Sequence, residues 1–593
     1  MYFIKITFII SFITYNTMCG IWQLFTKIST LTELQINQLI ELFNNSKNRG
    51  LDSHNFLIYD NYITGFHRLS INGLNPNGMQ PFTYETSTYK YSIICNGEIY
   101  NHHDLEQSMT NFTNISGSDC EFILPFLSEI CGDDIEMLVN RLNGEFAFVI
   151  VREKILNGNV DEFDVFLSTD PMSVRPLFYV ENYDKNVLMV SSTLNSLDLN
   201  GNVVLGNKME YEINRLKQGT IVNYKIKNNI IILKNEIQYY NFYSKNLAIN
   251  DLNENLFLFQ LIVDTFTSSI IKRITNSDRP IGLLNSGGLD SSLVCAVASK
   301  YLQLTNNTNK IKTFTIGFEG GTDLHYARLV ASHVNSIHTE IIKTPDEALS
   351  NIERTINVCG TYDITSIRAS IWQLMIAEYI ANNTDIKVLL TGEGSDEICG
   401  GYMYFHNAPN EEEAHLESLR LVRNIAYFDG LRADRCVSNF NLELRTPFQD
   451  KNFVNLFASI NPKFKQAIEK EGRMEKYLLR KAFDVVYKDE PILPEEVLWR
   501  RKEAFSDGTS QKEKSWFEMT QEYCKNKVSI EEYNDKVELY SYHNKPFSIE
   551  GYYYRKIFTE YFGHKSALTI PYIWMPKWSN TNDPSARTLK IYK

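Results

Sequence analysis

The stretch PIGLLNSGGLDSSLVCAVASKYLQ at residues 280–303 decides the fold of the C-terminal half of the chain. Its first part, IGLL at 281–284, is a short apolar run that predicts a buried strand, and the apolar run after Leu289 predicts a helix. The loop between them carries two adjacent glycines, which let backbone N–H groups approach a phosphate closely. The N-terminus of the following helix adds the positive end of its dipole. This order predicts a phosphate site between a strand and a helix.

Hydroxyl and carboxylate side chains gather at the same loop. Ser286, Ser291 and Ser292 can donate hydrogen bonds to phosphate oxygens, and Asp290 can hold a magnesium ion. The G-x-x-x-x-G-K-[ST] loop of P-loop NTPases occurs nowhere in the sequence. A Ser- and Gly-rich turn without a ligand is the alternative interpretation, and the strand–loop–helix order disfavours it.

Strand-then-helix alternation continues downstream of this loop. IKTFTIGF at 311–318 precedes DLHYARLVASHVNS at 323–336, and IKVLLTGEGSDE at 386–397 repeats the pattern. Such alternation predicts a parallel α/β sheet with ligand-binding loops at the ends of its strands.

The N-terminal part of the chain has a different texture. From Cys19 to about Leu216, short apolar runs such as YSIICNG (91–97) and FAFVIV (146–151) alternate with turns. This texture predicts an antiparallel sheet with few long helices. The polar stretch at 217–250 predicts strands and loops that lead out of that domain.

Length and composition narrow the class of protein. A chain of 593 residues exceeds what one hydrophobic core usually serves, so two or more domains are expected. A net charge of −12 argues against a nucleic-acid partner, because binding to a phosphate backbone needs clustered Lys and Arg. None of the nine cysteines forms a C-x-x-C pair, which favours free thiols in a reducing compartment and predicts a cytoplasmic protein.

The first 17 residues, MYFIKITFIISFITYNT, are as apolar as a signal peptide. They lack an A-x-A type of cleavage site and are too short to span a bilayer comfortably. No later stretch is long and apolar enough for a membrane span, so no membrane partner is expected. We interpret residues 1–18 as an extension that is untranslated or removed.

Several motifs of the C-terminal half resemble those of one family. SGGLDSS at 286–292 resembles the pyrophosphate loop of the ATP-pyrophosphatase family, whose members cleave ATP between its α and β phosphates. TGEGSDE at 391–397, followed by GGY at 400–402, resembles the corresponding segment of asparagine synthetases. DITSIRAS (363–370), RMEK (473–476) and WRRKEAFSDG (499–508) resemble three further segments of that family.

The resemblance implies a role for each matching residue. Asp290 and Asp396 would bind magnesium, Glu393 would help to deprotonate incoming ammonia, and Lys476 would neutralise phosphate charge as pyrophosphate leaves. The residues implied to bind ATP are Asn285, Ser286, Gly287, Gly288, Asp290, Ser291, Ser292, Ile316, Thr391 and Gly392. Those implied to face aspartate or the acyl-adenylate are Thr365, Ser366, Arg368, Asp396 and Glu397.

The N-terminal half resembles the class II glutamine amidotransferases. MCGI at 18–21, RLSI at 68–71, NGEIYN at 96–101 and GSDCE at 117–121 match its segments in the expected order. By resemblance Cys19 is the nucleophile, and the Asn96 side chain with the Gly97 backbone N–H forms the oxyanion hole. The residues implied to bind glutamine are Arg68, Leu69, Ser70, Ile71, Asn96, Gly97, Glu98 and Asp119.

The chemistry of Cys19 explains the importance of the extension. A free α-amine with an unperturbed pKa near 8 can take the thiol proton, so one residue supplies both nucleophile and base. An internal Cys19 has a peptide amide in place of that amine. We therefore expect the mature protein to begin at Cys19.

Some positions depart from the family pattern. Thr169 and Ser173 stand where the family has Arg and Gly, and Ser173 would be strained if that turn requires positive φ. Gln449 replaces an apolar Leu, and Asn285 stands where an apolar residue usually precedes the glycine loop.

These observations predict two domains. The resemblance implies an N-terminal-nucleophile αββα amidohydrolase sandwich at 19–216, and a connecting segment is expected at 217–250. A parallel α/β ATP-pyrophosphatase domain is expected at 251–593, so the fold class combines α+β with α/β.

The expected activity is ATP-dependent conversion of aspartate to asparagine with ammonia from glutamine, through β-aspartyl-AMP, with Mg²⁺ as metal ion. The expected partners are the small molecules glutamine, aspartate and ATP, and a homodimer stays an open alternative. Another acid–amine ligase on the same scaffold, a catalytically silent regulatory relative and a plain glutaminase are the rival interpretations.

Overall fold

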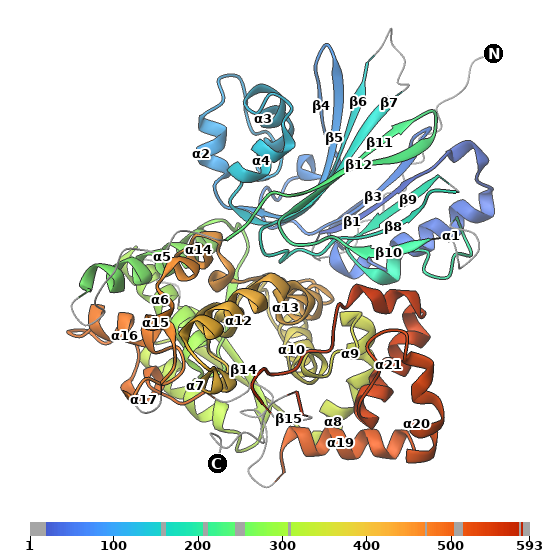
Figure 1. The fold of residues 1–593 in the computed structure, drawn as a ribbon. Helices are drawn as coiled ribbons and strands as arrows, with labels where there is room; N and C mark the ends of the chain where they lie inside the picture. Colours follow the sequence, from blue (N-terminus) through green and yellow to red (C-terminus); the bar gives the residue numbers. More distant parts are fainter. Residues whose placement is uncertain are drawn as a thin grey trace, which may run out of the picture. The chain divides into compact units, whose positions relative to one another are not determined.

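The computed structural model describes residues 19–155, 162–184, 186–204, 211–242, 255–305, 310–468, 471–502, 514–579 and 583–584 (Figure 1). The predicted extension at 1–18 lies outside these residues. The chain divides into two compact units. Unit 1 takes in the chain up to Asn241 with Ser438–Leu442 and Thr559–Thr569, and unit 2 takes in Phe242–Val437, Glu443–Phe558 and the segment from Ile570.

Two antiparallel sheets form the centre of unit 1. Among the described residues each sheet has six strands, in the orders β10-β8-β9-β1-β3-β2 and β12-β11-β7-β6-β5-β4. The strands of the first sheet are β1 (Gly20–Phe25), β2 (Ser53–Ile58), β3 (Tyr62–Arg68), β8 (Phe178–Asn182), β9 (Val187–Ser191) and β10 (Glu212–Arg215). Those of the second are β4 (Phe82–Glu85), β5 (Tyr89–Ile99), β6 (Gly144–Lys154), β7 (Glu162–Thr169), β11 (Thr220–Lys227) and β12 (Ile230–Gln238).

Helices cover the outer faces of these sheets. They are α1 (Glu33–Asn44), α2 (His102–Gln107), α3 (Ile123–Glu129) and α4 (Ile135–Arg141). One apolar core lies between the two sheets, and a second packs α2–α4 against the sheet that contains β5 and β6. On the other outer face, the Phe43 ring of α1 stacks on the His67 ring of β3, with ring centroids 3.8 Å apart. The predicted αββα sandwich is confirmed.

Unit 2 is built on a parallel sheet. Its described strands have the order β15-β14-β13-β16-β17, and each neighbouring pair is parallel. They are β13 (Ile281–Leu284), β14 (Lys312–Phe318), β15 (Ile337–Lys343), β16 (Val388–Leu390) and β17 (Glu443–Arg445). Three-residue β16 and four-residue β13 are almost wholly apolar, as expected for strands covered on both faces. The predicted parallel α/β domain is confirmed.

Helices surround this sheet. Those before β17 are α5 (Leu256–Thr275), α6 (Leu289–Leu304), α7 (Thr322–His333), α8 (Pro345–Ser350), α9 (Ile352–Cys359), α10 (Ile364–Asn383), α11 (Ser395–Cys399), α12 (Glu411–Asn424) and α13 (Asp429–Ser438). Those after it are α14 (Lys451–Ser459), α15 (Pro462–Lys465), α16 (Tyr477–Val486), α17 (Glu495–Leu498), α19 (Trp516–Lys527), α20 (Ile530–Lys536) and α21 (Ile549–Phe562). No helix among the described residues is long and apolar enough to cross a membrane.

The segment at 217–250 differs from the expected connection. Its described part supplies β11 and β12, and β11 pairs with β7 over Ile221–Lys227. Most residues of β11 are buried, and the strand lies between β7 and β12 in the second sheet of unit 1. β12 is an edge strand, and most of its residues are exposed. Its polar residues are the reason why the sequence of this segment resembles that of a connecting loop.

The turn after β7 has the positive φ at Ser173 that a glycine would adopt more easily. Ser173 has a φ of 49° in this turn, where the family pattern has glycine. Asp170 fixes the turn because its buried carboxylate accepts hydrogen bonds from the backbone N–H groups of Met172, Val174 and Arg175. Ser173 is therefore held in a conformation that favours glycine.

Candidate active sites

The glycine loop at 285–288 connects β13 to α6, as the sequence predicts. The Asn285 side chain braces it: Oδ1 accepts from the Gly287 N–H at 3.1 Å, and Nδ2 donates to the Ala327 carbonyl at 3.0 Å. Asn285 stands where the family pattern has an apolar residue, and these two hydrogen bonds give it a structural role. Gly287 has a φ of 69°, and a Cβ there would lie 2.5 Å from the Ala327 nitrogen. Glycine is therefore required at this position.

A pocket opens at this end of the sheet in unit 2. Twelve predicted site residues line it, and ten of these belong to the sets expected to bind ATP and aspartate: Asn285, Ser286, Gly288, Asp290, Ser291, Ile316, Thr391, Gly392, Asp396 and Glu397. Glu393 and Lys476 line the same pocket. Residues from four separate segments thus meet at one place, which is what a nucleotide and an amino-acid substrate would need.

The Lys476 ammonium lies between the two predicted metal ligands. Its Nζ is 2.5 Å from Asp290 Oδ2 and 2.6 Å from Asp396 Oδ1, and Lys502 Nζ is 2.7 Å from Asp396 Oδ2. A Cβ at Gly401 would lie 2.0 Å from Lys476 Cε, so glycine gives this lysine its room. The cluster joins two carboxylates to two ammonium groups.

The charged groups of this cluster shift one another's pKa values. Burial by itself would raise the pKa of the Asp396 carboxyl, but Lys476 and Lys502 outweigh it and hold that pKa well below its usual range. Burial likewise opposes the charge of Lys502, but Asp396 and Asp290 raise its pKa to about 12. At neutral pH both groups are therefore charged.

A buried network positions the two lysines. Glu475 Oε1 accepts from Arg480 NH2 at 2.9 Å and from the Lys502 backbone N–H at 2.8 Å. Lys476 itself has a φ of 58°, a strained conformation for a residue other than glycine. The carboxylate of Glu475 thus ties the segment of Lys476 to that of Lys502.

Glu393 is held beside the pocket. Its Oε1 accepts from Gln373 Nε2 at 3.1 Å and from Arg432 Nε at 3.3 Å. Burial raises the pKa of Glu393, and the charge of Arg432 only partly offsets it. A carboxylate with a raised pKa is suited to accept a proton.

Five predicted residues do not line the pocket as described: Gly287, Ser292, Thr365, Ser366 and Arg368. Arg368 is engaged elsewhere, with Glu550 at 2.6 Å and Asp583 at 3.0 Å, and all three are buried. Thr365 and Ser366 instead bond to Asp363, which caps the N-terminus of α10. Their segment is thus built around a helix cap and a buried ion-pair network.

Sequence reasoning missed other residues that line the pocket. Arg432 and Gln373 come from helices whose sequences carry no phosphate motif. Lys502 lies in the quoted WRRKEAFSDG segment and received no role, although its charge was the available signal. Residues 503–508 of that segment lie outside the described residues.

In unit 1, Cys19 lies directly before β1. Gly20 pairs with His67 of β3, and the Cys19 thiol donates to the Leu69 carbonyl at 3.5 Å. The half-buried Cys19 side chain packs against the core between the sheets, which includes Ala147. Ala147 is the register partner of Asn96, so Cys19 packs against the same core region as the predicted oxyanion hole.

The predicted oxyanion residues lie in β5. Asn96 is 1% exposed, and its Nδ2 donor has no hydrogen-bond partner in the described part of the chain. Gly97 has a φ of 141°, and a Cβ there would lie 2.0 Å from the Glu145 carbonyl oxygen. A buried, unused amide donor beside a required glycine fits a site for a developing negative charge.

The remaining predicted residues for glutamine are held by local contacts. Arg68 is buried and donates from NH1 to the Asn75 carbonyl at 2.8 Å. Glu98 Oε2 accepts from Asn72 at 2.5 Å, and Asp119 Oδ2 accepts from the Ile99 N–H at 2.5 Å. Leu69, Ser70 and Ile71 are buried directly after Arg68. Hydrogen bonds thus link the four sequence segments, through Leu69, Glu98 and Asp119.

Known proteins resemble the chain over nearly its full length. The family model described as asparagine synthase matches residues 262–423 and 407–582, and the glutamine amidotransferase domain matches residues 18–231. The asparagine synthetase (glutamine-hydrolyzing) of Cricetulus griseus is 37% identical over 596 residues, covering 97% of this chain and 99% of that protein. Those of Homo sapiens and Gallus gallus are 36% and 37% identical, with the same coverage of both chains.

Fold and sequence together define the class of the protein. An antiparallel sandwich of the glutamine amidotransferase type precedes a parallel α/β unit of the synthetase type. The chain belongs to the family of glutamine-hydrolysing asparagine synthetases.

Proposed function

We propose that this protein makes L-asparagine from L-aspartate, using ATP and ammonia released from L-glutamine. The other products are AMP, pyrophosphate and glutamate. The observation that carries this proposal is the convergence of Asp290, Asp396, Lys476 and Glu393 on the pocket beside the glycine loop. The family of the chain supports the same reaction.

The first step is activation of aspartate. Its β-carboxylate attacks the α-phosphorus of ATP, and the bond to the β-phosphate oxygen breaks, so that β-aspartyl-AMP and pyrophosphate form. Negative charge accumulates on the departing pyrophosphate. Buried Lys476 and half-buried Lys502 supply positive charge, and a fixed charge that is shielded from water stabilises such a transition state strongly.

Mg²⁺ belongs to this proposal as the metal ion. Asp290 and Asp396 offer carboxylate oxygens, the donors that Mg²⁺ prefers, and they already attract one cationic group between them. The donor set therefore fits. When bound, the ion would neutralise phosphate charge next to these two residues.

The second step transfers nitrogen. Ammonia attacks the acyl carbon of β-aspartyl-AMP, and AMP leaves with the electron pair of the broken C–O bond. The attacking nitrogen must lose a proton, and Glu393 is the proposed acceptor. Its raised pKa and its position in the pocket support that role.

Ammonia comes from glutamine in unit 1. The Cys19 thiol attacks the side-chain amide carbon, and its proton passes through the α-amine to the departing ammonia. Water then hydrolyses the thioester to glutamate. The unused Asn96 Nδ2 donor supports its role toward the oxyanion, with the Gly97 N–H as the second donor.

The cellular location and the oligomeric state are proposals as well. All nine cysteines are free, which supports a reducing compartment and hence a cytoplasmic location. A homodimer stays a prediction, and sedimentation velocity of the purified protein would test it.

The decisive experiment incubates the protein with labelled ATP, aspartate and glutamine. AMP, pyrophosphate and asparagine are expected, and heavy oxygen placed in the aspartate carboxylate should appear in AMP. ADP as the main product would refute the acyl-adenylate. Asparagine formation also separates this proposal from a different acid–amine ligase, from a silent relative and from a plain glutaminase.

A further inference from the structure

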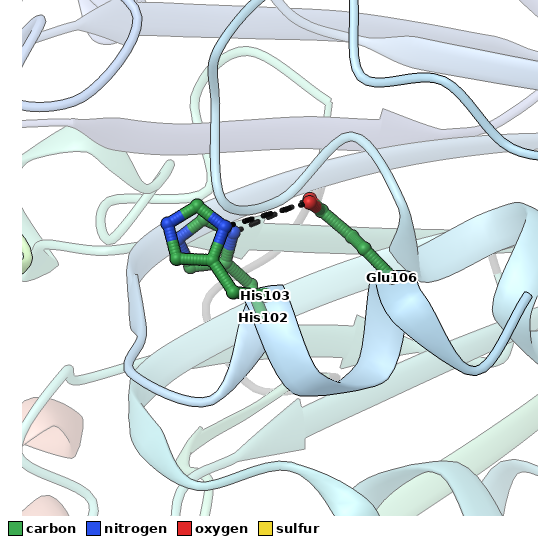
Figure 2. Close-up of side chains that lie close together, drawn as sticks. All are labelled: His102, His103 and Glu106. Carbon is green, nitrogen blue, oxygen red and sulfur yellow. Dashed lines mark hydrogen bonds and ion pairs between the residues drawn. The ribbon is translucent and has the colours of Figure 1, made fainter.

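A cluster of metal-binding side chains lies apart from the proposed catalytic residues, on the short helix α2. Figure 2 shows the His102 and His103 rings beside one another, with both facing the Glu106 carboxylate. His102 Nδ1 is 3.2 Å from Glu106 Oε1, and His103 Nδ1 is 3.8 Å from Glu106 Oε2. The possible ligand atoms of the three residues all lie within 4.8 Å of one another.

These distances fit a tetrahedral metal ion. Zn²⁺ lies about 2.0–2.2 Å from imidazole nitrogen and carboxylate oxygen, which places tetrahedral ligand atoms roughly 3.4 Å apart. The two nitrogen–oxygen distances of 3.2 and 3.8 Å fall on either side of that value.

Two of the three ligands are already held in place. The side chains of His102 and Glu106 are 7% and 15% exposed, and Asn114 Nδ2 donates to Glu106 Oε1 at 2.8 Å. His103 is 79% exposed and leaves a side of the cluster open to water. Such a site has two prepared ligands, one adjustable ligand and room for a solvent molecule.

We propose that His102, His103 and Glu106 bind a divalent transition-metal ion of the Zn²⁺ type. Two imidazoles and one carboxylate suit Zn²⁺, whereas Mg²⁺ and Ca²⁺ prefer oxygen donors throughout. This site is separate from the magnesium site proposed for unit 2.

Binding here would also stabilise the loop that carries Asp119. Asn114, which bonds Glu106, donates to the Ser118 carbonyl at 2.8 Å and accepts from the Gly117 N–H at 2.8 Å. Asp119 in turn accepts from the Ile99 N–H in β5. A fixed Glu106 therefore restrains the loop through Asn114.

Co²⁺ is the probe for this site, because a tetrahedral Co²⁺ ion absorbs visible light. The full chain should bind one Co²⁺ through α2, with visible bands that added Zn²⁺ removes. Glu106→Gln and His103→Ala should each weaken this binding at least tenfold. Both changes lie away from the core, and glutamine hydrolysis retained without added metal would show that unit 1 of the variants folds.

Cys19→Ala is the matched control, because it removes the accessible thiol and keeps the cluster. It should bind Co²⁺ through α2 as the unmodified chain does. Hydrogen exchange of residues 114–121 should slow when Zn²⁺ is added to the unmodified chain and should not change in Glu106→Gln. Equal Co²⁺ binding by the unmodified chain and both cluster variants, or no Co²⁺ binding at all, would overturn the proposal.

Discussion

At the residue scale, Gln449 is a buried amide without a use that we can identify. It is 3% exposed, and neither its Nε2 nor its Oε1 has a hydrogen-bond partner in the described part of the chain. It packs on Gly394, where a Cβ would lie 2.7 Å from Gln449 Cγ. Burying an unpaired amide costs free energy that an apolar side chain of similar size avoids.

Gln449→Leu should therefore stabilise unit 2, by about 1 kcal/mol. Urea unfolding followed by hydrogen exchange in β16 and β17 would measure the change. The control is Gln260→Leu, because Gln260 is exposed and bonds Asp264 at 2.8 Å. A gain in the control equal to that at Gln449 would show that the effect has another origin.

Ser173 provides a second test at this scale. Its φ of 49° strains a residue with a side chain, and its buried hydroxyl has no partner among the described residues. Ser173→Gly should raise the free energy of unfolding of unit 1 by about 1 kcal/mol. Ser168→Gly is the control and should destabilise, because the Ser168 hydroxyl donates to the Thr220 carbonyl at 3.1 Å within the sheet.

At the element scale, the loop between β13 and α6 depends on one glycine. Gly287→Ala would force a Cβ to within 2.5 Å of the Ala327 nitrogen and the Tyr326 Cβ, both in α7. ATP affinity should fall at least tenfold, as measured by equilibrium binding. Gly320→Ala is the control. Gly320 also has a positive φ, of 80°, but nothing lies within 4 Å of a Cβ placed there. Equal losses in both variants would assign the effect to backbone strain instead of the α7 contact.

The packing of α1 on β3 predicts acid sensitivity. His67 stacks on Phe43, and burial lowers its pKa to about 3. An unfolded histidine has a pKa of about 6.5, so between these values the unfolded chain binds one more proton than the folded chain. This contribution to stability is complete above pH 6.5 and is lost as the pH falls toward 3, at roughly 1.4 kcal/mol per pH unit.

His67→Phe should keep the stacked ring and remove the titration. Hydrogen-exchange protection of β1 and β3 would be measured at pH 4.5 and pH 6. The free energy of unfolding should then change less steeply with pH, by the amount that corresponds to about one proton fewer taken up on unfolding. The absolute protection can fall, because the contact of Nε2 with the Phe43 carbonyl at 3.1 Å is lost. An unchanged pH dependence would rule out His67 as the titrating group.

At the scale of the whole molecule, two chemistries lie in two compact units with separate cores. Cys19→Ala should abolish glutamine-dependent asparagine synthesis and leave synthesis from added ammonium intact, because the synthetase residues are all in unit 2. Initial rates with each nitrogen source would measure this. The reciprocal variant, Asp396→Asn, should remove synthesis with either source and keep glutamine hydrolysis. Loss of ammonium-dependent synthesis in a folded Cys19→Ala variant would contradict the separation.

The sequence alone determined the local parts of this protein. The strand, glycine loop and helix at 281–304 follow from apolar runs and from φ values that only glycine adopts freely. The antiparallel texture before residue 216 and the parallel alternation after 280 predicted both kinds of sheet. These features depend on neighbours in the chain, so they can be inferred from short stretches.

Only the tertiary structure decided which side chains meet. Lys502, Arg432 and Gln373 contact the acidic pocket residues from segments distant in sequence, whereas Arg368 pairs with Glu550 and Asp583. Likewise, β11 and β12 belong to the sandwich because β11 pairs with β7 and β12 pairs with β11. Ion pairs and strand neighbours are set by long-range packing, and a charged residue in a sequence does not carry the identity of its partner.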